Sequence, residues 1–142
     1  MSPPQSCVWK DAPEFTVPDM KAFLWDSDDL WLCYGMAHTS PLRYTIVRFT
    51  HVIDHRLSPI NDEGIGKHPY AKAGLKFYSF NEITGSRETT EWSVLGARHW
   101  VVTFKDDTLD VVASDAKVVA TDRLDEAADD RYEADETADG AR

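Results

Sequence analysis

Cysteine and long apolar runs are scarce in this sequence. The 142 residues include only two cysteines, Cys7 and Cys33, too few for a disulfide framework and without the paired spacing of a metal motif. No run approaches the roughly 18 apolar residues of a membrane span, and the first residues lack a basic segment with an apolar stretch behind it. We therefore expect two free thiols and a soluble, cytoplasmic protein that does not enter a membrane.

Basic residues are also in short supply. The chain has 15 Lys and Arg against 25 Asp and Glu, which gives a net charge of -10. Residues 121–142 hold nine of these acids and only three arginines. Proteins bind nucleic acid through stripes of Lys and Arg that release counterions from the phosphates, so this balance argues against direct binding of DNA or RNA. A basic protein partner fits the charge better.

Several motifs of catalysis and cofactor binding are missing. The sequence has no Gly-x-Ser-x-Gly nucleophile elbow, and the cysteines have no basic neighbourhood beyond Lys10 near Cys7. Residues 61–67 mix acids, glycines and a lysine, but His68 and a proline follow where a phosphate-binding loop needs Ser or Thr before a helix. This segment also lacks the alternating oxygen ligands of a calcium loop. We interpret it as turn structure and expect no cofactor.

The sequence does contain enough apolar residues for one folded domain. Hydrophobic residues make up 42% of the chain, with five Trp, five Tyr and six Phe. Each buried aromatic ring removes a large apolar area from water, so a chain of this composition folds around a core. We expect one β-rich globular domain over residues 1–120. Residues 121–142, acidic and poor in apolar side chains, are expected to form a disordered tail.

β-Branched and aromatic residues dominate the predicted secondary structure. Thr16, Pro18 and Asp19 have the pattern of a helix start, which predicts a short N-terminal helix through Trp25. Runs of strand-forming residues bounded by turn residues predict strands over 30–34, 43–53, 75–82, 88–94, 98–105, 109–113 and 116–120. The protein is therefore expected to be mainly β. We expect a small antiparallel barrel or a two-sheet sandwich, with a four-strand meander over residues 75–113 and Trp100, Val102 and Phe104 facing the core.

A long interrupted segment, residues 54–74, is where we expect a functional surface. Five Pro and Gly residues break any regular period there, and loops of this length within compact domains often carry sites. The ionisable binding candidates in it are His55, Arg56, Asp62, Glu63 and His68.

Two further binding candidates lie outside this loop. Because Trp100 faces the core, His99 faces the other side of its strand by alternation. Trp92 lies in an otherwise polar stretch, where an exposed Trp is typical of a binding anchor. Both have structural alternatives, His99 as a satisfied or solvent-exposed histidine and Trp92 as a cap on the edge of the core.

A metal site is an alternative interpretation of the same region. His51, His55 and one carboxylate, Asp54, Asp62 or Glu63, have the composition of a 2-His-1-carboxylate site. In an extended strand, however, the Cα atoms of His51 and His55 lie about 13 Å apart, too far for one ion. In the competing interpretation, these side chains pair with Arg56 and with loop backbone groups.

The sequence leads to two functional hypotheses. The first is an interaction module whose acidic surface and 54–74 loop cover a basic protein partner, as inhibitors and immunity proteins do, with salt-sensitive association. The second is a small-ligand-binding protein or metal-assisted enzyme with a cavity in the β shell, lined by aromatic residues and by His55, His68 or His99. We favour the first, because the charge asymmetry supports it and no catalytic spacing supports an enzyme.

Overall fold

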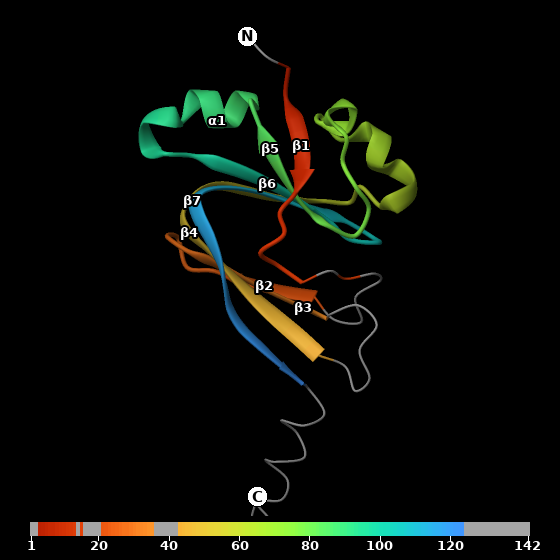
Figure 1. The fold of residues 1–142 in the computed structure, drawn as a ribbon, viewed down its shortest axis with the longest axis vertical. Coiled ribbons are helices and arrows are strands. Elements are labelled where there is room, and N and C mark those ends of the chain that lie inside the picture. The colour runs from red at the N-terminus through yellow and green to blue at the C-terminus, as the bar shows by residue number, and fades with distance from the viewer. Residues whose placement is uncertain (1–2, 14, 16–20, 36–42, 124–142) are drawn as a thin grey trace, which may run out of the picture.

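The computed structural model describes residues 3–13, 15, 21–35 and 43–123. These residues form one antiparallel sheet of seven strands in the order β1-β5-β6-β7-β4-β3-β2 (Figure 1). The strands are β1 (Gln5–Val8), β2 (Lys21–Trp25), β3 (Leu30–Gly35), β4 (Arg43–Ser58), β5 (Phe80–Thr84), β6 (Arg98–Thr103) and β7 (Thr108–Arg123). The protein is mainly β, as predicted, and the sheet does not close, since β1 and β2 are its two edges.

The two longest strands, β4 and β7, determine the shape of the sheet. Each has 16 residues, and they pair from Arg43 and Arg123 at one end to Ser58 and Thr108 at the other. Their register shifts twice, between Ile46 and Val47 and between Val52 and Asp54. Such bulges bend a strand and increase its twist. The sheet therefore folds over, with β5 and β6 above β2 and β3 in Figure 1.

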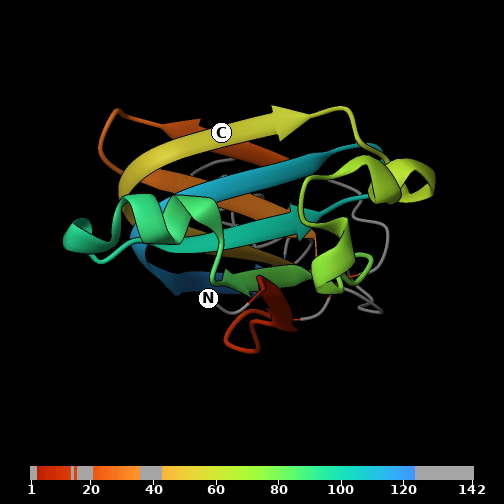
Figure 2. The same cartoon turned by 90° about the horizontal axis from the view of Figure 1, so that it is seen from above.

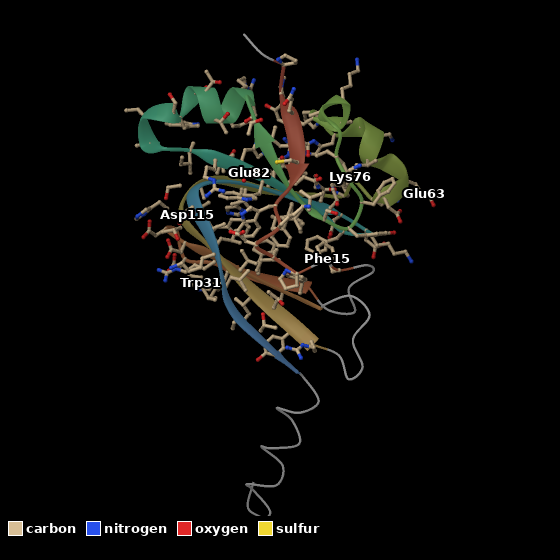
Figure 3. The ribbon with its side chains drawn as sticks, viewed as in Figure 1. Phe15, Trp31, Glu63, Lys76, Glu82 and Asp115 are labelled. Carbon is tan, nitrogen blue, oxygen red and sulfur yellow. The ribbon has the colours of Figure 1, made fainter. Side chains whose placement is uncertain are left out.

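Contacts between distant strands show how far the sheet bends. Phe80 on β5 and Tyr34 on β3 have ring centroids 5.4 Å apart, although three strands separate β5 from β3. In a flat sheet, strands four positions apart would lie about 19 Å from each other. Phe15 fills the space between the halves, 5.0 Å from Tyr34 and 5.4 Å from Phe104 (Figure 3). The core therefore lies inside the fold of a single sheet.

The core residues follow the strand alternation. Trp100, Val102 and Phe104 are buried together with Leu109, Val111 and Ala113 of the next strand, which confirms that Trp100, Val102 and Phe104 face the core. Each buried large apolar side chain contributes about 1.5–3 kcal/mol relative to an exposed one. On the opposite face of β6, His99, Val101 and Thr103 are also buried, so this strand is covered on both sides.

One predicted helix is a strand over the part that the structure describes. Lys21–Trp25 forms β2 and pairs with β3, whereas residues 16–20 lie outside the described residues. The helix signal came from Thr16, Pro18 and Asp19. The segment that follows is apolar and aromatic, and pairing with a neighbouring strand decides its structure, because such side chains fit a pleated surface.

A second prediction is also wrong, and here a segment expected to be a strand forms helices. The strand predicted over residues 88–94 is helical, with α1 (Arg87–Glu91) followed by the 3₁₀ helix η3 (Ser93–Leu95). Ser86 begins α1 as its N-cap, because its Oγ accepts a hydrogen bond of 3.1 Å from the backbone N–H of Thr89. Strands β5, β6 and β7 do pair in sequence, but α1 replaces the fourth strand of the expected meander.

The strands before the expected loop and the expected tail both extend further than predicted. β4 continues through Ser58, so residues 54–58 are strand, and the rest of the segment contains the 3₁₀ helices η1 (Asp62–Lys67) and η2 (Ala71–Ala73). β7 continues to Arg123, and the tail beyond it lies outside the described residues. Figure 2 shows α1 and the η1–η2 segment on the same face of the sheet, which positions both elements around the site described next.

Candidate functional site

A pocket with a polar lining lies on the face of the sheet opposite the core. Alternation places Asp110 of β7 on this face because Leu109 and Val111 point into the core. α1 and the η1–η2 segment supply the other walls. The pocket is open, has a volume of about 80 Å³, and includes among its lining residues Arg56, His68, Tyr70, Glu88, His99 and Asp110.

Asp110 lies between two buried histidines. Its Oδ1 is 2.8 Å from Nε2 of His68, and its Oδ2 is 3.0 Å from Nε2 of His99. The side chains of His68 and His99 are 2% and 1% exposed, whereas that of Asp110 is 20% exposed. The η1–η2 segment covers this face of the sheet and is called the covering segment below. The Asp110 carboxylate therefore joins the covering segment to β6 and β7 and still reaches the pocket.

Backbone geometry fixes the tautomer of His68. The backbone N–H of Tyr70 donates to Nδ1 of His68 over 3.0 Å, and an amide N–H can only donate. Nδ1 is therefore unprotonated, so the proton is on Nε2 and is donated to Asp110. His99 has contacts on both nitrogens as well, with Nδ1 3.1 Å from Oγ of Ser86.

The histidines also determine the ionisation of Asp110. Burial raises the pKa of this carboxyl group, but the hydrogen bonds from His68 and His99 lower it. The net result is a pKa below the usual value for aspartate. Asp110 is therefore a carboxylate at neutral pH and accepts hydrogen bonds without donating any.

A second polar pair, Tyr70 and Glu88, forms the wall of the pocket next to His99. The hydroxyl of Tyr70 donates to Oε1 of Glu88 and accepts the backbone N–H of Arg87 over 3.1 Å. Burial, and then the bond to Glu88, raises the pKa of Tyr70, so this hydroxyl stays protonated. Oε1 of Glu88 is also 3.9 Å from Nδ1 of His99. Within the described residues, no hydrogen bond reaches the other oxygen of Glu88, Oε2.

Ser86, His99 and Asp110 follow one another as in a catalytic triad, but this arrangement does not present a nucleophile. Ser86 is 0% exposed and does not line the pocket. Its Oγ already accepts the N–H of Thr89 as the helix cap. A nucleophile must reach a substrate carbon, so the role of Ser86 is to attach α1 to the sheet.

A metal site in this pocket does not follow from the geometry. Among the described residues, the only three side chains with ligand atoms within 4.8 Å of one another are Asp28, Asp29 and His51. Asp29 there accepts hydrogen bonds of 2.8 and 2.5 Å from the guanidinium of Arg48, which already balances its charge. In the pocket, Asp110 itself occupies the space between the two Nε2 atoms.

The proposed ligand set His51, His55 and Asp54 is not brought together by the structure. His51 lies at the bulged part of β4, with Nδ1 3.3 Å from Oδ1 of Asp28. His55 lies further along the strand and packs against Trp25, with ring centroids 4.6 Å apart. Asp54 and His55 line the pocket around Asp110 instead.

The structure separates the seven predicted binding residues into three places. The pocket includes His55, Arg56, His68 and His99. Asp62 and Glu63 lie on η1, where Asp62 accepts a hydrogen bond of 2.6 Å from the Tyr78 hydroxyl and Glu63 is exposed (Figure 3).

Trp92, the last of the seven, is the C-cap of α1. It is 40% exposed, near Val94 and Leu95, which are 89% and 54% exposed. The pocket residues that sequence reasoning missed include Tyr70, Glu88 and Asp110. Asp110 carried a signal, since it is an acid at an alternate position of an apolar strand.

Comparisons with protein-family models, with curated proteins and with solved structures found no match for this chain. In the described part of the chain, no helix has the length and apolar character needed to cross a membrane.

Proposed function

We propose that this protein binds a small polar ligand in the pocket around Asp110. The observation that carries the proposal is the position of Asp110, a charged carboxylate held by two buried histidines in the wall of an open pocket. Ionisable groups that are shifted in pKa and lie in a concave site are typical of binding and catalytic sites. The sequence suggested a small-ligand site as its second hypothesis, but in a cavity inside the β shell, whereas this pocket lies on the face of the sheet opposite the core.

The size of the pocket limits the ligand. Its volume is about 80 Å³, roughly half that of an engineered cavity of about 150 Å³ that holds benzene. A ligand, or the part of it that enters, therefore has about three or four non-hydrogen atoms. The pocket is open on one side, so a larger molecule can place one end inside.

The pocket is also preorganised. The side chains of His68, His99 and Tyr70 each take part in two hydrogen bonds. A site that is rigid before binding loses little conformational entropy when a ligand enters. The geometry therefore supports specific binding by a preformed site.

The test is ligand-observed NMR with a panel of small polar compounds. Ser58→Phe places a ring in the pocket from β4, whereas Val119→Phe adds the same ring at an exposed position of β7 outside it. We expect wild-type protein and Val119→Phe to give saturation transfer to the same compounds and Ser58→Phe to lose it. Equal transfer to both variants, or none to the wild type, would refute the proposal.

The acidic interaction surface stays a second proposal, supported by the net charge of -10. Residues 124–142, which hold eight of the nine acids after residue 120, lie outside the described residues. A basic partner would bind the full chain in a salt-sensitive way and lose affinity when these residues are deleted. Binding that is unchanged by the deletion and by salt would contradict it.

A further inference from the structure

We infer that the ligand of this pocket carries a primary ammonium group. The inference rests on the proposed function and names the chemical class of ligand that the pocket is built to accept. Its three supports are the charges that line the pocket, the hydrogen-bonding capacity that its polar groups have left, and the apolar surface beside them.

The charges of the lining residues favour a cation. Asp54, Glu88 and Asp110 contribute three carboxylates, and Arg56 contributes one guanidinium. His68 is neutral because its Nδ1 accepts a backbone N–H. Apart from its histidines, the lining carries three negative charges and one positive charge, in a chain whose net charge is -10. Both the local and the overall field attract a cation.

The unused hydrogen-bonding groups of the pocket also favour a cation. The donors of His68 and His99 at Nε2 are directed at Asp110, and the hydroxyl of Tyr70 is donated to Glu88. Oε2 of Glu88 accepts no hydrogen bond from the described residues. Among the ionisable residues that line the pocket, only His55 and Arg56 are left to donate to an anion. The pocket thus offers acceptors, and an ammonium group brings three donors.

Apolar side chains complete the fit. Ile60, Pro69 and Val112 line the pocket together with the polar groups. A short alkyl chain can lie against them while its ammonium end reaches Glu88. With a volume of about 80 Å³, the pocket accommodates roughly three methylene groups and one ammonium nitrogen. A small alkylamine or the end of a lysine side chain has these dimensions.

The experiment compares three probes of nearly equal size: propylammonium, propionate and 1-propanol. Each is titrated into ¹⁵N-labelled full-length protein at neutral pH, with amide chemical shifts as the readout. A ligand of this size binds with a Kd of about 1–10 mM. We expect propylammonium to bind at least about fivefold more tightly than propionate or propanol, since a charge-assisted hydrogen bond to Glu88 is available only to the cation.

Two matched variants test the position of the ammonium. Glu88→Gln and Glu91→Gln remove the same charge from the same helix, but only Glu88 lines the pocket, whereas Glu91 is exposed outside it. We expect Glu88→Gln to weaken propylammonium binding by about five- to tenfold, and Glu91→Gln to change it by less than about twofold. Equal losses in both variants would mean that only the overall field acts, which overturns the inference.

The remaining outcomes separate this inference from the proposed function. Tighter binding of propionate, abolished by Arg56→Gln, would overturn the ammonium assignment and leave the pocket as a binding site. No shift at pocket residues with any of the three probes would overturn both.

A blocked lysine, N-acetyl-lysine N-methylamide, carries the same ammonium on a peptide unit. If the blocked lysine binds more tightly than propylammonium, the ammonium group of the natural ligand belongs to a protein side chain. If the blocked lysine binds more weakly, the natural ligand is a free amine.

Discussion

His68 and Asp110 are 42 residues apart in the sequence, yet their side chains are joined by a hydrogen bond of 2.8 Å. His68 is the C-cap of η1, and Asp110 lies on β7. The bond therefore fixes the covering segment to the sheet. His99 makes the second bond to the same carboxylate, so removing Asp110 affects both histidines at once.

Asp110→Asn is expected to lower the free energy of unfolding by about 2–4 kcal/mol. An amide has one acceptor oxygen, so its NH₂ group would face an Nε2–H of one histidine and leave that buried donor unsatisfied. Urea unfolding followed by tryptophan fluorescence measures the change. Asp106→Asn, at an exposed turn position, is the control and should cost less than about 0.5 kcal/mol. A similar small cost for Asp110→Asn would contradict the network.

The stability of the protein should depend on Asp110 at acidic pH. The pKa of this group is lowered in the folded state, so its contribution is complete above the unfolded pKa of about 3.9. The contribution is lost as pH falls from there through the lower folded pKa, because protonation removes the charge that both histidines stabilise. Unfolding curves measured from about pH 6 to 3 should fall less steeply for Asp110→Asn than for wild type. Parallel curves would be inconsistent with the lowered pKa.

Alanine substitutions in the covering segment and β4 should have graded effects. His68→Ala removes a buried side chain with two hydrogen-bonding partners and is expected to cost about 2–3 kcal/mol. Asp62→Ala, which loses the bond to Tyr78, should cost about 1 kcal/mol. Arg56→Ala and Glu63→Ala, both exposed, should stay within about 0.5 kcal/mol of wild type. Thermal unfolding of the four variants measures these losses of stability. A loss for Glu63→Ala as large as that for His68→Ala would contradict the predicted ranking.

Ser86→Ala distinguishes a helix cap from a nucleophile. Loss of the cap and of the contact with His99 should lower the unfolding free energy by about 1–2 kcal/mol. Ligand binding should be retained, because Ser86 does not line the pocket. Ser93→Ala, at an exposed position after α1, is the matched control. If Ser86→Ala abolished binding while leaving stability unchanged, the serine would have to act on the ligand directly.

Part of the site could be predicted from strand alternation. The same rule that places Trp100 in the core places His99 on the opposite face. Applied to the next strand, it also places Asp110 on that face, since Leu109 and Val111 are in the core. Val101 pairs with Asp110 and Val112 with His99, so His99 and Asp110 are diagonal neighbours on one face of the sheet.

The rest of the site depends on contacts that no local pattern contains. His68 and Tyr70 reach the pocket only because the η1–η2 segment folds back over β7, and Glu88 only because residues 87–91 are a helix. Residues 88–91 include two threonines, which favoured a strand in the sequence. The cap at Ser86 and the bond from Tyr70 to Glu88 stabilise the helix instead. Tertiary contacts therefore overrode local propensity at this position.

Chemical-shift mapping with propylammonium tests most directly whether the pocket around Asp110 is the binding site. At saturation, the largest amide chemical-shift changes should occur at Arg56, Tyr70, Glu88, His99 and Asp110, together with a change in the ring signals of His99. Shift changes elsewhere should be small. Shifts centred instead on the exposed apolar surface beside Trp31 and Ile46, or near Trp92, would show that the ligand binds elsewhere. The absence of any shift at the pocket residues at saturating probe concentration would contradict the assignment of this pocket as the functional site.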